Sequence, residues 1–364
     1  MPDALAWLTI DLGAVVANWQ SLRSRMASKQ CAAVVKADAY GLGLEKVGTA
    51  LYAAGCRLFF VAHLQEALAL RRFLPDAEIA VLSGLGPREA PEFTAGQILP
   101  VLNDIDQIRA WDRHCADKVA RFPAILHVDT GMNRLGLLPT EALALQKDPA
   151  HFKNMTLRAL ISHLACADEP DHPLNLQQLE TFSAVRNSFP AIPASLAASS
   201  GLFLDEKYQF DFGRPGAAIY GLNPTPGKAN PQRPTLRLEA RILQVRRVDR
   251  PMTVGYGAAY SVRGPTSVAT IGVGYADGYL RSLSNRGTVT ISGIPVPIIG
   301  RVSMDLITLD ITKLPESFAQ PGQTVCLIGD ELTPDGVAQN ADTIGYEILT
   351  SLGHRYTRRY LEPM

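Results

Sequence analysis

The sequence has few cysteines, and their arrangement excludes two common kinds of site. Five cysteines occur in 364 residues, an odd number, and they lie far apart with no CxxC pair and no His/Cys spacing. A disulfide framework and a structural zinc site both need closely patterned cysteines. We therefore predict no metal site and a protein of the reducing cytoplasm. The five are Cys31, Cys56, Cys115, Cys166 and Cys326.

The sequence also lacks an excess of charge of either sign and lacks a long apolar run. Acidic and basic residues number 35 each, so there is no basic footprint for nucleic acid. The longest uncharged stretch, residues 187–204, contains two prolines and several serines, which a spanning helix would avoid. The N-terminus has no basic segment followed by an apolar one. We expect neither a nucleic acid nor a membrane as a partner.

The residues that are present alternate between two patterns over the first part of the chain. From Cys31 to about Gly221, short β-branched or apolar runs alternate with stretches whose apolar residues are three or four apart. This alternation predicts repeated βα units. Eight strand candidates predict an α/β fold with a (β/α)8 TIM-like barrel over residues 10–226. They are AAVVK, LFFVA, AEIAVLSG, ILPVLN, FPAILHVDT, LRALISHLA, SLAAS and GAAIYG.

Polar residues stand at or just beyond the ends of these apolar runs. Barrel active sites are built from the C-terminal ends of strands and the following loops, so these residues are candidates for chemistry. Each could equally be a helix cap or a turn former. They are Lys36, His63, Asn103, Asp129, His163 and Ser199.

The pattern changes after about Pro224. A segment rich in proline and polar residues, NPTPGKANPQRPT, precedes alternating strands punctuated by glycine and proline. This predicts a mainly antiparallel β domain over residues 227–364, on which residues 1–9 could also pack. A helical stretch, ADTIGYEILTSLGHRY, follows near the end of the chain.

Lys36 is the candidate with the clearest chemical requirement. It ends an apolar run, where an ammonium group is costly unless its pKa falls or its amine is used covalently. A Schiff-base lysine meets that requirement, and a lysine that reaches out to solvent meets it equally well. Tyr40 and the glycines at 41 and 43 follow, and they could bring a hydroxyl and close backbone to a phosphate.

Motifs in both parts of the chain resemble those of the alanine racemases, which are fold type III pyridoxal-phosphate enzymes. The cofactor-lysine motif is VVKADAYGLG, and six more follow in family order. They are DTGMNRLG, SHLACAD, RPGAAIYG, VGYGAAY, GYADGY and GRVSMD. The barrel followed by a β domain is also that family's fold.

The resemblance implies two bases on opposite faces of a pyridoxal 5'-phosphate cofactor. Lys36 would carry the cofactor and act as one base. Tyr256 would be the other, supplied by the β domain of the partner subunit, which implies a homodimer. A phenol has an ordinary pKa of about 10 and needs help to act as a base. The family provides this through a hydrogen-bond chain matched here by His163 and Arg214.

The remaining roles carry over in the same way. Arg214 would face the pyridine nitrogen and keep it unprotonated, because a guanidinium remains charged. Arg134 would bind the phenolic oxygen of the cofactor and the substrate carboxylate. The phosphate would be held by Tyr40, Ser199, Gly216, Ala217 and Tyr356. The substrate pocket would be lined from the partner by Tyr275, Met304 and Asp305, which leave room for little more than a methyl group.

Four positions depart from the family's pattern. His127 stands where many members have a carbamylated lysine that orients the arginine, so Arg134 must be held in another way. Ala198 replaces an asparagine before the phosphate-binding serine, and Leu42 replaces a histidine. The C-terminal tyrosine of the family corresponds to His354, with Tyr356 nearby.

The resemblance implies reversible interconversion of L- and D-alanine, an isomerase activity that supplies D-alanine for peptidoglycan. Breakdown of excess alanine would use the same site, so the sequence leaves that role open. A racemase of broader specificity, acting on serine or lysine, is an alternative on the same scaffold. A noncatalytic pyridoxal-phosphate carrier would need neither the β domain nor Tyr256. A barrel hydrolase without cofactor would leave Lys36 unmodified and show no visible absorbance.

Overall fold

The computed structural model describes residues 4–26 and 30–363, which form two compact units. One unit consists of Val15–Ala39 and Gly43–Arg233. The other consists of the described residues up to Ala14, the short segment Tyr40–Leu42, and the described residues from Pro234 onward. No helix in the described part of the chain is long and apolar enough to cross a membrane.

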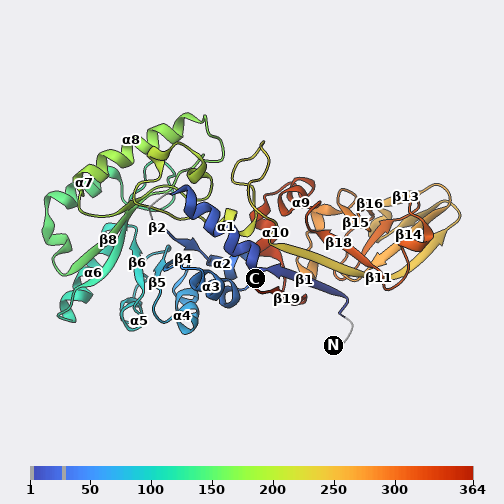
Figure 1. Ribbon diagram of the computed structural model, residues 1–364, viewed down its shortest axis with the longest axis horizontal. Helices are drawn as coiled ribbons and strands as arrows, with labels where there is room; N and C mark the ends of the chain where they lie inside the picture. Colours follow the sequence, from blue (N-terminus) through green and yellow to red (C-terminus); the bar gives the residue numbers. More distant parts are fainter. Residues whose placement is uncertain (1–3, 27–29, 364) are drawn as a thin grey trace. The chain divides into compact units, whose positions relative to one another are not determined.

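The first unit is built on parallel strands in chain order. Most residues of these strands are apolar and buried, as expected for strands covered on both faces. The helices α3 to α8 lie outside them (Figure 1). The strands are β3 (Ala33–Val34), β4 (Leu58–Val61), β5 (Glu78–Val81), β6 (Leu99–Leu102), β7 (Phe122–His127), β8 (Met155–Ile161) and β9 (Ala194–Ser195). The helices are α3 (Leu44–Ala53), α4 (Leu64–Phe73), α5 (Ala90–Ala95), α6 (Ile105–Asp117), α7 (Pro139–Lys147) and α8 (Pro173–Ser188).

The eighth strand lies earlier in the chain than the sequence predicts. The run GAAIYG was wrongly predicted as a strand, because Ala217–Tyr220 forms a buried 3-10 helix. The strand is instead β10 (Phe212–Gly213), which pairs in parallel with β2 (Gln30–Cys31). Backbone hydrogen bonds from Asp211 and Arg214 to β9 and the Ala197 carbonyl continue the ring on its other side. These bonds close the barrel.

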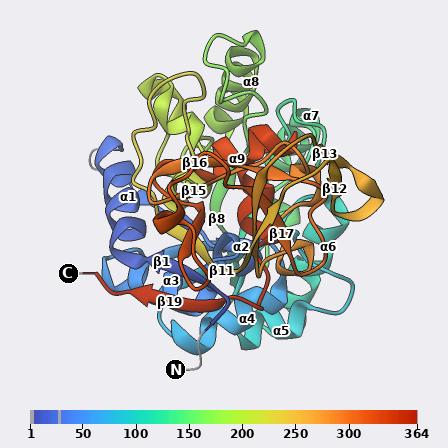
Figure 2. The same ribbon diagram turned by 90° about the vertical axis from the view of Figure 1, so that its right-hand side faces the viewer.

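The second unit is mainly antiparallel, as predicted. Its long strand β11 (Leu236–Val248) pairs with three others, and β1 (Ala6–Asp11) pairs with β11 antiparallel and with β19 (Thr357–Leu361) in parallel. Figure 2 shows β19 beside β1. The other strands are β12 (Met252–Val254), β13 (Tyr260–Val262), β14 (Thr266–Ile271), β15 (Thr288–Ile291), β16 (Ile294–Ile299), β17 (Ile307–Asp310) and β18 (Thr324–Ile328). The predicted C-terminal helical stretch, residues 341–356, is helical in its middle as α10 (Gly345–Ser351), and α9 (Pro334–Ala341) ends where the stretch begins.

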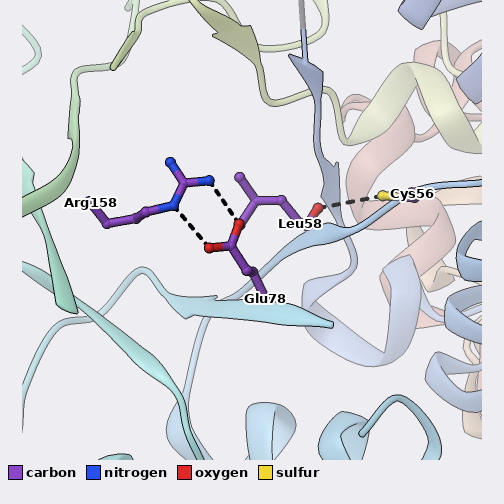
Figure 3. A network of polar contacts seen from close by, with 4 residues as sticks. All are labelled: Cys56, Leu58, Glu78 and Arg158. Atoms are coloured by element: carbon purple, nitrogen blue, oxygen red, sulfur yellow. Dashed lines mark hydrogen bonds and ion pairs between the residues drawn. The ribbon is translucent and has the colours of Figure 1, made fainter. Parts of the chain in front are cut away.

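An ion pair crosses the inside of the barrel near the start of the strands. Arg158 of β8 donates two hydrogen bonds to Glu78, the first residue of β5, at 2.9 and 2.8 Å (Figure 3). Strands β6 and β7 separate β5 from β8 in the sheet, so the side chains meet across the barrel interior. Figure 3 also shows the Cys56 thiol donating to the Leu58 carbonyl. The pair ties together the end of the barrel opposite the expected active site.

We expect Arg158→Met to destabilise the fold without changing catalysis. The substitution leaves the Glu78 carboxylate without its bidentate partner, but water reaches both side chains and screens the loss. The free energy of unfolding should fall by about 1 kcal/mol. Urea unfolding followed by circular dichroism measures this loss. A large change in turnover without a change in stability would contradict this account of the pair.

Candidate active site

Lys36 lies at the C-terminal end of β3, half-buried at the mouth of the barrel. Burial lowers the pKa of its ammonium group, and the positive charge of Arg134 lowers it further. The carboxylate of Glu66 opposes this effect. A lowered pKa favours the neutral amine, the form that attacks an aldehyde to give a Schiff base.

The chain takes an uncommon path immediately after Lys36. Ala37, Asp38, Ala39 and Tyr40 all have φ between 52° and 56°, so α2 (Lys36–Tyr40) contains a left-handed turn. Left-handed backbone costs about 1–2 kcal/mol per residue for residues with a Cβ. Because four such residues follow one another, surrounding contacts must hold the turn in place.

Arg214 is fully enclosed at the end of β10. Burial lowers its pKa to about 9, so the guanidinium is charged at neutral pH. One terminal nitrogen donates to the Ser195 carbonyl at 2.9 Å and to the Ser195 hydroxyl, and the other donates to the Ser162 carbonyl. These two serines were missed in the sequence because their contacts join distant segments. They fix the plane of the guanidinium.

A buried polar network supports the loops after β7 and β8. Gln178 of α8 donates to the Thr130 hydroxyl at 3.2 Å and to the His163 carbonyl at 2.9 Å. The Thr130 hydroxyl is in turn 2.8 Å from the Ser162 hydroxyl. Gln178 is fully buried, and nothing in the sequence of α8, which contains several other polar residues, distinguishes it. The network holds the backbone of His163 against the barrel.

His127 and His163 are both held neutral. Burial, and then the charge of Arg214, lower the pKa of His163 to about 3 and that of His127 to about 4. His127 Nδ1 is 2.7 Å from the Asn103 side-chain oxygen. Nδ1 therefore carries the proton and Nε2 is left as an acceptor. His127 thus keeps a neutral ring bonded to Asn103 at the position where the sequence departs from the family's pattern.

These two histidines should make stability depend on pH. Their pKa values are lower in the folded protein than the ordinary value near 6.5, so the unfolded chain binds protons first as pH falls. Their contribution is complete above about pH 6.5 and falls as pH drops toward 4 and then 3. The loss is on the order of 1 kcal/mol per pH unit for each histidine.

The test is urea unfolding of the wild type and His127→Gln between pH 6.5 and 4.5. The variant removes one titrating group, so its unfolding free energy should decline less steeply with falling pH. Parallel curves would show that His127 is not held neutral in the folded protein.

Donors converge on one oxygen where β9 and β10 end. The Ser199 hydroxyl oxygen accepts the backbone N–H groups of Gly216 at 3.0 Å and Ala218 at 3.1 Å. Ser199, Gly216 and Ala217 are all buried. Ala217 was predicted as a backbone donor to the phosphate. In the structure, the neighbouring Ala218 is the residue that donates to Ser199. Because the Ser199 oxygen accepts both of these bonds, its own O–H is left to donate elsewhere, which suits a phosphate oxygen.

The donor set therefore fits an anionic cofactor. Lys36, Arg134 and Arg214 all influence the titration of His163, so three basic side chains surround one mouth of the barrel. Pyridoxal phosphate brings the negative charge that would balance them, an aldehyde for Lys36 and a phosphate for the Ser199 cradle. Among the described residues, no group of three or more His, Cys, Asp and Glu side chains could hold a metal ion.

The predicted residues of the β domain lie on loops of the second unit and are exposed. Tyr256, between β12 and β13, is 72% exposed, Met304 is 53% and Tyr275 is 42%. Backbone hydrogen bonds join the Tyr275 loop to the Met304 loop. The Tyr275 N–H donates to the Ser303 carbonyl at 3.0 Å, and the Ala276 N–H donates to the Met304 carbonyl at 3.0 Å. Large exposed side chains held on ordered loops are typical of a binding surface.

Two further residues brace these loops. Arg355 contacts Asp277 at 3.0 Å and Asp305 at 2.8 Å, so it links the loops of Tyr275 and Met304. Asn285 donates to the Ala259 carbonyl at 3.1 Å and accepts from the Gly300 N–H at 2.6 Å. It thereby joins the Tyr256 loop to the Met304 loop. Neither residue was identified from the sequence.

The two tyrosines assigned to phosphate both belong to the second unit. The ring of Tyr40 lies 6.1 Å from that of Tyr346, and burial raises the pKa of its hydroxyl. Burial also raises the pKa of Tyr356, whose hydroxyl has no hydrogen-bond partner in the described part of the chain. A buried hydroxyl without a partner is costly unless a ligand or water satisfies it. His354, the alternative at this end of the chain, is exposed.

Both units of the chain match known proteins. Residues 10–224 match the family model for the alanine racemase N-terminal domain, and residues 235–360 match that for the C-terminal domain. An alanine racemase of Rhodospirillum rubrum is 50% identical over 359 residues, covering 98% of this chain and 96% of the relative. A catabolic alanine racemase of Mesorhizobium japonicum is 46% identical, covering 98% and 93%.

A solved structure agrees closely in three dimensions. The alanine racemase of Bartonella henselae, with covalently bound pyridoxal phosphate, is 43% identical with a TM-score of 0.95. The match covers 98% of this chain and 100% of that one. Two family models that together span nearly the whole chain, and relatives near half identity, leave one assignment: the chain belongs to the alanine racemase family.

Proposed function

We propose that this protein interconverts L- and D-alanine with Lys36 and the partner subunit's Tyr256 as opposed bases. The protein is a pyridoxal-phosphate-dependent isomerase of the alanine racemase family. The observation that carries the proposal is Lys36 itself, a lysine with a lowered pKa at the mouth of the barrel, in the cofactor-lysine motif of that family. When bound, the cofactor supplies an electron-withdrawing ring that acidifies the Cα proton of the substrate.

Three basic residues of the barrel have different roles toward the cofactor and the substrate. Lys36 carries a proton to and from one face of the substrate Cα at its Nζ atom. Arg214, fixed by Ser195 and Ser162, presents a permanent positive charge to the pyridine nitrogen and keeps it unprotonated. This limits the spread of negative charge into the ring and favours return of the proton to Cα. Arg134 binds the substrate carboxylate with its planar donors.

The phosphate is held by a hydroxyl and by main-chain donors. Ser199, Gly216 and Ala217, which follow β9 and β10, would bind it, and Tyr40 and Tyr356 would contribute hydroxyl groups. The unpartnered hydroxyl of Tyr356 supports this role, since a phosphate oxygen would satisfy it.

The second base comes from another copy of the chain. Tyr256 acts on the opposite face of Cα and removes the proton of L-alanine, which leaves D-alanine to Lys36. A hydrogen-bond chain through His163 to Arg214 would help its phenol act as a base. Tyr275, Met304 and Asp305 of the same partner limit the pocket to a methyl side chain. The exposure of Tyr256, Tyr275 and Met304 on braced loops supports a homodimer in which these side chains become covered. All five cysteines are free, which supports a location in the reducing cytoplasm.

Mixing two inactive variants tests the shared site. Lys36→Ala removes one base and Tyr256→Phe the other, so each pure variant should be inactive. In a hybrid dimer, one site combines the intact Lys36 of one subunit with the intact Tyr256 of the other. Random reassociation after mild denaturation should restore about a quarter of wild-type activity, because half the dimers are hybrids with one working site each. No recovery would show that both bases come from one subunit.

A further inference from the structure

Glu66 joins the residue after Lys36 to the next strand of the barrel. It lies in the first turn of α4, and its Oε2 atom accepts the backbone N–H groups of Ala62 at 2.7 Å and His63 at 3.1 Å. Its Oε1 atom accepts the N–H of Ala37 at 2.6 Å. One carboxylate therefore binds three main-chain donors from the ends of β3 and β4.

Only part of this arrangement is needed to begin a helix. The bond to His63 closes a capping box at the start of α4. Glu141 makes the corresponding bond in α7, accepting the Leu138 N–H at 2.8 Å. The contact with Ala37 is additional and reaches a segment 29 residues earlier in the sequence. Capping alone does not account for it.

The contact lies at the start of the left-handed turn. Ala37 is the first of the four residues with positive φ, and its N–H is the peptide group that joins it to Lys36. At the far end of the turn, the Asp38 carboxylate accepts the Leu44 N–H at 2.7 Å, and the Asp38 carbonyl accepts the Gly43 N–H. A strained turn keeps its shape only when its surroundings restrain it. Glu66 restrains it from another element, at the peptide that follows Lys36.

We propose that Glu66 is a positioning residue for Lys36: it holds the peptide that follows the lysine and so aims Nζ at one face of the substrate. The inference rests on the proposed function, in which Lys36 is the base that faces D-alanine. A displacement of about 1 Å is enough to cost a base much of its efficiency. The consequence should be a defect that depends on the enantiomer supplied.

The charge of Glu66 adds a second effect at the same place. The charged and titratable groups that interact with Lys36 are Arg134, Glu66 and His163. Burial and Arg134 lower the pKa of the Lys36 ammonium, and the Glu66 anion raises it. Loss of the anion should therefore move the titration of Lys36 to lower pH. A purely structural role of Glu66, without an electrostatic effect on Lys36, would leave the titration of Lys36 unchanged.

Glu66→Gln and Glu141→Gln form a matched pair for the test. Both remove the charge from a glutamate that accepts the N–H of its helix's N-cap residue, but only the first disturbs Ala37. In holoenzyme, the amide hydrogens of a peptide covering residues 33–44 should exchange faster in Glu66→Gln and remain unchanged in Glu141→Gln. Exchange of the α-proton of D-alanine with deuterated water should fall about tenfold relative to that of L-alanine. Its pH profile should move to lower pH.

The other possible results decide between this inference, a purely structural role for Glu66, and failure of the proposed function. An equal loss with both enantiomers, or the same result in Glu141→Gln, would overturn the inference. If Glu66→Gln does not fold, Glu66→Asp keeps the charge but shortens the reach to Ala37, and the same enantiomer difference is expected. If the wild type exchanges neither enantiomer, the proposed function fails. The amide-exchange comparison then still decides whether Glu66 holds the Lys36 turn.

Discussion

Lys36→Ala is expected to lower racemisation of alanine by about 10⁴-fold or more and to abolish the visible absorbance of the cofactor-bound protein. The side chain has two tasks, covalent attachment of the cofactor and proton transfer at one face, and alanine performs neither. Its half-buried position and lowered pKa equip it for both. The measurement combines an absorbance spectrum with chiral chromatography of alanine after incubation.

Lys46→Ala is the matched control for this substitution. Lys46 is exposed in α3, ten residues further along the chain, and should leave both the spectrum and the rate unchanged. A Lys36→Ala protein that kept its visible absorbance would show that the cofactor is carried elsewhere.

Tyr256→Phe is expected to separate the two enantiomers. The substitution removes only a hydroxyl from a side chain that is 72% exposed, so folding should not change. Exchange of the α-proton of L-alanine should fall by about 10³-fold, because its base is lost. Exchange with D-alanine should decline much less, since Lys36 is intact. Cofactor absorbance should remain.

The control for this substitution is Tyr260→Phe. Tyr260 begins β13, four residues beyond Tyr256, and has no part in the proposed mechanism. It should exchange both enantiomers at the wild-type rate. Loss of exchange with both enantiomers in Tyr256→Phe would contradict a base specific to L-alanine.

The sequence predicts the barrel because burial imposes a strong pattern on parallel strands. Seven of the eight apolar runs contain or overlap a strand of the ring. The eighth fails because a short buried apolar run suits a 3-10 helix as well as a strand, and periodicity cannot separate the two. The strand there, Phe212–Gly213, has only two residues and leaves no periodic signal.

The site shows the same division between local and long-range information. Lys36 and His163 follow apolar runs, so their place at strand ends can be read from the sequence. Arg214 follows β10, the strand that the sequence did not predict. The serines that hold Arg214, and Glu66 beside Ala37, act across long sequence separations and leave no local pattern. The left-handed turn could not be predicted either, because alanine, aspartate and tyrosine ordinarily avoid positive φ.

Sequence proximity was misleading at one point. Tyr40 follows Lys36 by four residues, yet Tyr40–Leu42 packs with the second unit. The Arg358 guanidinium donates to the Gly41 carbonyl, and the Tyr360 hydroxyl donates to the Leu42 carbonyl at 3.1 Å. A Cβ on Gly41, whose φ is 81°, would lie 2.4 Å from the Leu349 carbonyl oxygen. Close packing, together with positive φ, therefore requires this glycine.

The central claim is tested most directly by the enantiomer ratio of alanine after incubation with the purified holoenzyme. The two enantiomers have equal free energies in water, so a racemase must bring either one to a ratio of 1:1. We predict that L-alanine and D-alanine both reach this ratio, and that serine and lysine change little in the same time. If alanine kept its optical rotation while serine or lysine lost it, the assignment of alanine as substrate would be wrong.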